Sequence, residues 1–177
     1  MNKRILVAVL LLVGSLTCFA RSSDKQMTEP FHFESTRRRL KDNYDKIKEL
    51  SGKMQNEGKS FYPNTDMRVR YRGEMCSLGQ VFPTSTVALT EALNHGMMID
   101  ERLADIIKGK DVYANLQRIE GECYHIEEYC NNGIKQLRFS RLYITESLKK
   151  TWVSALKRIS AYSAEIREQV ELIREAL

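Results

Sequence analysis

The sequence predicts an all-α protein, namely an elongated helical bundle with a long C-terminal helix and a small irregular insert at about residues 58–83. Apolar side chains recur every three or four residues through most of the chain, which is the spacing of one helix face. No proline follows Pro83, so the second half of the chain has nothing to break long helices. The chain has 177 residues, of which 42% are hydrophobic and 29% charged, as expected for one globular domain.

The first twenty residues have the three parts of a secretory signal peptide. A basic start is followed by the apolar run Ile5–Leu16, and Cys18 and Ala20 supply small residues where a signal peptidase cleaves. This run has 12 residues, whereas a membrane span needs roughly 20. We therefore expect residues 1–20 to be removed rather than kept as an anchor. The mature protein would then be periplasmic or extracellular and would lack a transmembrane span.

Cys18 offers a second route, in which a lipid is attached to it. Bacterial lipoprotein signals carry Leu three residues before that Cys and Gly or Ala just before it, whereas this chain has Ser15 and Thr17. The sequence therefore favours cleavage after Ala20 over lipid anchoring. Cleavage leaves 157 residues and lowers the net charge from +5 to +3. So mild a positive charge on an exported protein gives no reason to expect a nucleic-acid partner.

Residues 21–30 are polar and end in a proline, so we expect a flexible leader before a single helical domain, residues 31–177. From about Ser35 to Glu57, apolar residues are spaced by four, three, three and four, which predicts an amphipathic helix that ends at Gly58. The apolar residues are Leu40, Tyr44, Ile47, Leu50 and Met54. Charged residues, including Arg37–Arg39, occupy the remaining faces, where we expect them to be solvated.

The insert at 58–83 loses the helical period because it contains Pro63, Pro83 and three glycines. Within it, Met67–Arg72 alternates apolar and basic residues, which is typical of a half-buried strand. No partner strand is evident, so the sequence favours an extended loop packed on the helices. Loops of this length are usually either functional or disordered.

After Pro83, two shorter helical segments are expected. Thr84, Ser85 and Thr86 are candidate N-caps for a helix that Gly96 would end. Asp100 would cap a second short helical segment, with Gly109 after it.

Two further stretches carry the strongest helical signal. The first has apolar residues spaced 4, 3, 4, 3, 4: Val112, Leu116, Ile119, Cys123, Ile126 and Cys130. This is a heptad pattern. Asn131–Gly133 then predicts a turn. The second stretch contains Leu148, Trp152, Leu156, Ile159, Ser163, Ile166, Val170, Ile173 and Leu177. It predicts a helix over Lys135–Leu177, about 64 Å long at 1.5 Å per residue, with Ser163 as the weak point of its packing.

Three cysteines remain after cleavage, in a compartment where disulfides persist. Cys123 and Cys130 face the same side of one helix but lie about 10.5 Å apart along its axis. A disulfide tolerates only about 4.4 to 6.8 Å between Cα atoms. We therefore expect Cys76 to pair with one of them, with Cys130 slightly favoured over Cys123 because it adjoins the predicted turn. Three free thiols acting as small hydrophobic residues are the alternative.

No catalytic, cofactor-binding or metal-binding motif stands out, so the sequence predicts no enzyme and no cofactor. Cys123, His125 and Cys130, together with Cys76 and His95, could supply zinc ligands, but Cys123 and His125 point to different sides of a helix. The carboxylates of Glu120, Glu122, Glu127 and Glu128 are expected to form a solvated face. The three histidines, His32, His95 and His125, share no neighbourhood that the sequence reveals.

Tyrosine suits surfaces where an apolar body meets water, including protein interfaces. Packing beside the helix seams is the alternative role for six of the eight tyrosines: Tyr62, Tyr71, Tyr124, Tyr129, Tyr143 and Tyr162. We take Tyr71, Tyr162 and the single tryptophan, Trp152, as candidate contact residues.

In layout, the chain resembles the small exported minor-pilus subunits of type IV secretion and conjugation systems. Those subunits combine a long-helix bundle with a small irregular appendage between the first and later helices. The resemblance implies an assembly protein that contacts other envelope or secretion-system proteins or a second copy of itself. It assigns no residue a role. A periplasmic helical chaperone and a secreted inhibitor-type binding protein are the alternatives.

Overall fold

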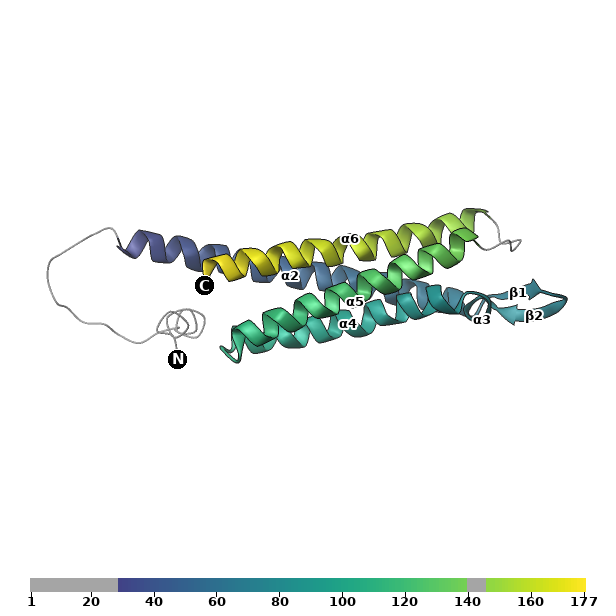
Figure 1. The fold of residues 1–177 in the computed structure, drawn as a ribbon, viewed down its shortest axis with the longest axis horizontal. Coiled ribbons are helices and arrows are strands. Elements are labelled where there is room, and N and C mark those ends of the chain that lie inside the picture. Colours follow the sequence, from purple (N-terminus) through teal and green to yellow (C-terminus); the bar gives the residue numbers. More distant parts are fainter. Residues whose placement is uncertain (1–28, 140–145) are drawn as a thin grey trace, which may run out of the picture.

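The computed structural model describes residues 29–139 and 146–177, and these form a long helical bundle (Figure 1). Its long helices are α2 (Glu29–Thr65), α4 (Pro83–Ile107), α5 (Val112–Phe139) and α6 (Glu146–Ala176). Between α2 and α4 lie the strands β1 (Arg68–Tyr71) and β2 (Glu74–Ser77) and the short helix α3 (Leu78–Val81). The predicted all-α bundle with a long C-terminal helix and a small insert is confirmed. The predicted signal peptide, including Cys18, lies outside the described residues.

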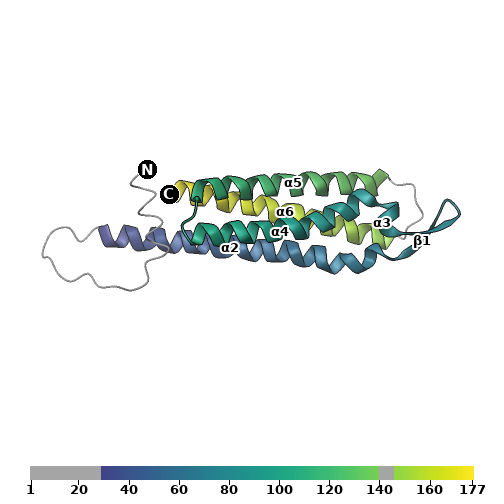
Figure 2. The same cartoon turned by 90° about the horizontal axis from the view of Figure 1, so that it is seen from below.

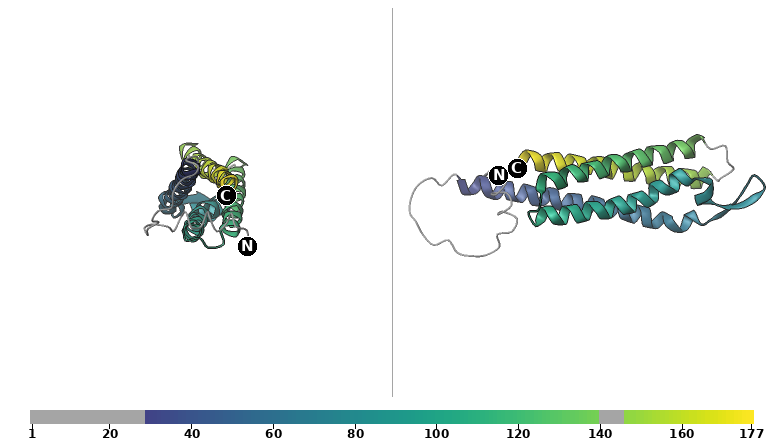
Figure 3. Two further views of the ribbon diagram at one scale, coloured as in Figure 1. Left: turned by 90° about the vertical axis from the view of Figure 1, so that its left-hand side faces the viewer. Right: turned by 60° about the horizontal axis from the view of Figure 1, so that its bottom comes forward.

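The long helices run alternately up and down, and each packs on the next one in sequence (Figures 1 and 2). Helix α6 also packs on α2, which closes the ring, whereas α4 and α6 barely touch across it. The end-on view shows the long helices arranged around one shared centre (Figure 3). Such a bundle buries one stripe of each helix in a common core.

The predicted apolar seams form that core. Both the heptad stretch of α5 and the stripe of α6 are buried from end to end, except that Leu148 and Leu177 are half-buried. The seam continues past Cys130 through Ile134 and Leu137. In α2, all five predicted core residues are buried as well. Arg37–Arg39 are exposed, as expected.

Helix α2 is longer than predicted at both ends. It begins at Glu29, so the last two residues of the predicted leader are helical, and it does not end at Gly58. A Cβ atom on Gly58 would lie 2.6 Å from the carbonyl oxygen of Leu89, closer than such atoms can approach. Gly58 therefore serves to bring the backbones of α2 and α4 together rather than to end a helix.

Gly96 and Gly133 also lie inside helices, whereas the sequence predicted a helix end at Gly96 and a turn at Asn131–Gly133. Gly96 is buried inside α4, where a Cβ would lie 2.7 Å from Cγ of Gln55. Asp100 is likewise inside α4 rather than at a cap. Gly133 is buried inside α5, where a Cβ would lie 3.1 Å from both Leu156 Cδ1 and Ser85 Cα. The predicted turn at Asn131–Gly133 is therefore wrong.

The C-terminal helix is accordingly shorter than predicted. Helix α5 runs on to Phe139, and α6 starts at Glu146 rather than Lys135. The 31 residues of α6 give a length of about 46 Å.

The insert contains a β-hairpin instead of an unpaired loop. Strands β1 and β2 are antiparallel, with Val69 opposite Cys76 and Arg70 opposite Met75. Arg72 and Gly73 link them with φ angles of 50° and 90°, which is the backbone of a two-residue type I′ hairpin turn.

Helix α3 attaches this hairpin to the bundle. Ser77 caps α3 by accepting a hydrogen bond from the Gln80 backbone N–H, and the Gln80 side chain accepts one from the Ser77 backbone in return. Leu78 at its start and Phe82 just after its end are both buried in the core. The hairpin therefore projects from an anchored base beyond the end of the bundle (Figure 2).

Two sets of hydrogen bonds join neighbouring helices inside the bundle. Ser163, expected to weaken the packing, donates a buried 2.9 Å hydrogen bond to the backbone carbonyl of Cys123. Asp100 of α4 accepts hydrogen bonds from Ser51 and from the Gln55 amide of α2, the latter at 2.7 Å. Among the described helices, none is both long and apolar enough to cross a membrane.

Candidate functional site

The end of the bundle that carries the hairpin exposes large apolar side chains. Phe139, the last residue of α5, is 83% exposed, and Met75 of β2 and Met67 just before β1 are 51% and 45% exposed. On the hairpin, Met75 shares its face with Arg68 and Arg70, because side chains alternate along a strand. The Arg68 guanidinium donates a hydrogen bond to the Met75 carbonyl oxygen at 3.1 Å. Met75 and the two arginines thus combine apolar and basic groups on one face of the hairpin.

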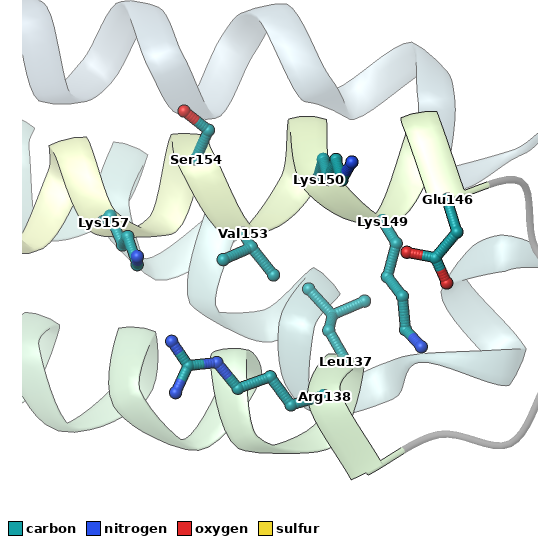
Figure 4. A pocket seen from close by; sticks show the side chains of 8 residues that line it. All are labelled: Leu137, Arg138, Glu146, Lys149, Lys150, Val153, Ser154 and Lys157. Atoms are coloured by element: carbon teal, nitrogen blue, oxygen red, sulfur yellow. The ribbon is translucent and has the colours of Figure 1, made fainter.

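A groove of about 440 Å³ lies at the same end, between the last turn of α5 and the first turns of α6 (Figure 4). Leu137 of α5 and Val153 of α6 face each other across it, so its centre is apolar. Four basic side chains and one acidic side chain line it. They are Arg138, Lys149, Lys150, Lys157 and Glu146. We call the exposed Met67, Met75 and Phe139 together with this groove the hairpin-end surface.

The basic groups of the groove are mostly available for a ligand. Among the described residues, no carboxylate forms an ion pair with Arg138, Lys150 or Lys157. The neighbouring Arg158 differs, because its guanidinium bonds both carboxylate oxygens of Glu57 on α2, at 2.6 and 2.9 Å. These hydrogen bonds raise the pKa of Arg158. Arg138, Lys150 and Lys157 are all exposed, so the groove presents their positive charge to the solvent.

The predicted disulfide is not present in the structure. Cys76, Cys123 and Cys130 are all free thiols. Cys123 and Cys130 lie in the bundle core, whereas Cys76 lies half-buried on the hairpin. The expectation that Cys123 and Cys130 face one side of a helix was right. The pairing with Cys76 was wrong because the hairpin projects from the end of the bundle, while Cys130 is enclosed by neighbouring helices.

Burial changes the chemistry of the two core thiols. Removal from water disfavours the thiolate, so burial raises the pKa of Cys123 and of Cys130 to about 12. Both therefore behave as small apolar core residues, the alternative that the sequence had left open.

Of the three candidate contact residues, Trp152 belongs to the core. It is 1% exposed and packs edge-to-face on Phe82, with ring centroids 6.3 Å apart. Trp152 therefore packs in the core, and its predicted role as a contact residue was wrong. Tyr162 is half-buried against the core. Tyr71 is half-buried on the hairpin, with the Arg72 guanidinium 5.2 Å from its ring centroid, so it remains part of the hairpin end.

The structure also brings together two histidines that the sequence left unconnected. The imidazole of His95 on α4 lies between Glu91, at 3.3 Å, and Glu122 of α5, and it stacks on His125 at 6.1 Å. Both ring nitrogens of His95 face a carboxylate, Nε2 that of Glu91 and Nδ1 that of Glu122. The four-residue spacing of Glu91 and His95 on one helix could have predicted their contact. The contact of His95 with Glu122 of α5 could not be predicted from the sequence. In the described parts of the chain, no group of metal-ligating side chains converges.

Two of the α5 carboxylates expected to be solvated are instead bonded to α6. Glu127 accepts two hydrogen bonds of 3.0 Å from Arg167, and Glu120 accepts one of 2.7 Å from Arg174. Glu128 is exposed, as predicted. The contacts of Glu120, Glu122 and Glu127 tie α5 to its two neighbours.

Comparisons of the chain with protein families, with curated proteins and with solved structures find no match.

Proposed function

We propose that this protein is exported to the cell envelope and acts there through protein–protein contacts, with the hairpin-end surface as its contact site. The observation that carries this proposal is the exposure of Phe139, which at 83% is the most exposed large apolar side chain of the described residues and lies at the same end of the rod as the exposed Met67 and Met75. Water-exposed apolar side chains cost free energy unless a partner covers them. Methionine, aromatic residues and arginine are also the types that protein interfaces favour.

The rod shape supports a role in assembly rather than in catalysis. A long bundle that ends in a small anchored hairpin holds a contact surface away from the rest of the molecule. The layout resembles that of minor-pilus subunits of type IV secretion and conjugation systems, and we propose this as the finer form of the function. The partner would be another envelope protein of such a system.

Site-specific photocrosslinking in the native cell tests the proposal. A photoreactive amino acid is placed at Met75 or Phe139 of the full chain, with Tyr113 as the control site. Tyr113 is 46% exposed at the start of α5, at the opposite end of the bundle. We expect discrete crosslinked products of defined mass from the first two sites only. Equal crosslinking from Tyr113, or no discrete product from any site, would contradict the proposal.

Two further measurements separate the parts of the proposal. Cell fractionation should recover the processed protein outside the cytoplasm, and retention of the full-length chain in the cytoplasm would refute export. Suppression of the aggregation of an unfolded model protein, at stoichiometric amounts and without discrete crosslinks, would favour the chaperone alternative.

A further inference from the structure

The groove between α5 and α6 has the chemistry to recognise a specific kind of partner. Its basic side chains include Arg138, Lys150 and Lys157, which no described carboxylate neutralises. Such a groove attracts negative charge and repels basic segments. The ligand it suits must therefore carry at least one carboxylate or a comparable anion.

The centre of the groove adds a second requirement. Half-buried Val153 supplies the apolar wall between the basic side chains, whereas Leu137 opposite it belongs to the buried core (Figure 4). A ligand that fills the groove therefore places an apolar group against Val153. A small hydrated anion would leave this apolar surface uncovered. An acidic segment that carries an apolar side chain would satisfy both requirements.

The shape of the site favours a protein segment over a membrane. The groove is recessed between two helices and has a volume of about 440 Å³, whereas a bilayer offers a broad surface that does not enter a recess. Lys150 and Lys157 stand seven residues apart on α6, which is about 10.5 Å along the axis. Carboxylates four residues apart on an extended segment point to the same side, roughly 13 Å apart, and the flexible lysine side chains can take up the difference.

We propose that this groove binds an acidic segment of the partner protein, with carboxylates against Lys150 and Lys157 and an apolar side chain against Val153. This inference rests on the proposed function, because it names the part of the partner that the hairpin-end surface would hold. Specificity would come from the combination of charge with an apolar anchor.

Binding of a defined peptide tests the inference directly. The probe is a fluorescein-labelled synthetic peptide of nine residues, with two Glu four positions apart and a Leu midway between them, so that all three side chains share one side of the extended peptide. Its counterpart replaces both Glu by Gln. Fluorescence anisotropy with the purified full chain should show saturable binding of the Glu peptide that weakens as salt rises, and little binding of the Gln peptide.

Variants then locate the binding. The double variant Lys150→Gln/Lys157→Gln should weaken binding of the Glu peptide by roughly tenfold. The matched control Lys41→Gln/Lys48→Gln removes the same charge from exposed positions on α2 and should leave binding unchanged. Val153→Thr keeps the side-chain shape but adds a hydroxyl, and we expect about a threefold to tenfold loss. Unaltered circular dichroism shows that each variant is folded.

Three results would overturn the inference. They are an absence of peptide binding, equal loss in the α2 control variant, and binding of the chain to vesicles rich in anionic lipid through Lys150 and Lys157 without binding of the peptide. A photocrosslinker at Ser154 beside the groove separates this failure from that of the proposed function. If Met75 and Phe139 crosslink to a partner in cells but Ser154 does not, only the groove inference fails. If all three sites are silent, the proposed function fails too.

Discussion

On the C-terminal half of α6, Arg167 and Arg174 bond carboxylates of α5, whereas Lys150 and Lys157 on the N-terminal half have no such partner among the described residues. The same pair of helices therefore forms ion pairs between its members far from the hairpin, whereas these two lysines near the hairpin end form none with any described residue. Phe139 lies at that end too, 83% exposed, while the α5 seam behind it is fully buried.

The two ends of the α5–α6 pair therefore differ in what their side chains contact. Where α5 and α6 hold each other, opposite charges and apolar side chains meet within the chain. At the hairpin-end surface, both kinds of group face outward, as the proposed contact with a partner requires. The predictions below test whether the rod interior and the hairpin end really differ in this way.

The largest difference should appear in thiol reactivity. Cys76 on the half-buried hairpin should react with iodoacetamide at least about a thousandfold faster than Cys123 and Cys130, whose exposure requires unfolding against several kcal/mol. Timed labelling followed by peptide mass mapping measures all three. Rapid labelling of either core cysteine, or recovery of Cys76 in a disulfide under non-reducing conditions, would contradict this difference between the rod interior and the hairpin.

Truncation of a core ring should cost far more than truncation of an end ring. Trp152→Ala removes a ring that is 1% exposed, so we expect the free energy of unfolding to fall by about 3–5 kcal/mol. Phe139→Ala removes a ring that is 83% exposed and should change it by less than about 0.5 kcal/mol. Urea denaturation followed by circular dichroism gives both values. Similar losses would place Phe139 in the core.

Alkaline pH should weaken the rod interior. Burial raises the pKa of Cys123 and Cys130 from 9.0 to about 12, and that of Tyr44 from 10.0 to about 12. Between those values the unfolded chain releases protons that the folded chain keeps, so stability is present below pH 9 and falls as pH rises towards 12. The fall is at most about 1.4 kcal/mol per pH unit for each group.

Urea midpoints between pH 8 and pH 11 measure this dependence. The variant Cys123→Ala/Cys130→Ala serves as the control, because it should show a shallower slope even though it starts from a lower stability. An identical slope in the variant would mean that the core thiols are not responsible.

Two glycines of α2 should respond to alanine in opposite directions. A Cβ on Gly58 would collide with the Leu89 carbonyl oxygen of α4, so Gly58→Ala should destabilise by about 1–3 kcal/mol. Nothing lies within 4 Å of a Cβ on Gly52, so Gly52→Ala should stabilise the helix by about 0.5–1 kcal/mol. Thermal unfolding of both variants provides the measurement. Stabilisation by Gly58→Ala would refute the close approach of α2 and α4.

The smallest expected effect is the change in the free energy of unfolding when one charged side chain of α6 is removed. Arg167 bonds Glu127 and lies over the ring of Tyr124, 4.3 Å from its centroid. Arg167→Ala should therefore cost about 0.5–1 kcal/mol at low salt, less at high salt. Lys157→Ala should change stability by less than about 0.5 kcal/mol. A larger cost for Lys157→Ala would show that the groove cations stabilise the fold rather than await a ligand.

The helical seams were predictable because they depend on local spacing alone. Every residue of the heptad pattern from Val112 to Cys130 is buried, as its periodicity required. The helix ends were not predictable, because Gly58, Gly96 and Gly133 are each compatible with two different roles. A glycine can end a helix, or it can let two helices approach closely, and only the neighbouring backbone decides between them.

The hairpin and the groove were harder to foresee for related reasons. Glu74–Ser77 lacks the alternation of apolar and polar residues that reveals a strand, so the partner of β1 went unseen. The groove depends on α5 ending at Phe139 and α6 beginning at Glu146, whereas the sequence placed the turn at Asn131–Gly133. Its basic residues therefore seemed to lie along one continuous helix.

The alternating direction of the helices places Glu29, the first described residue, and Ala176 at the end of the rod opposite the hairpin (Figure 1). A fluorescent protein fused to the C-terminus, or attachment to a sensor chip through that terminus, would keep the hairpin about 46 Å away, the length of α6. Molecules immobilised in this way would all display the same end to the solution.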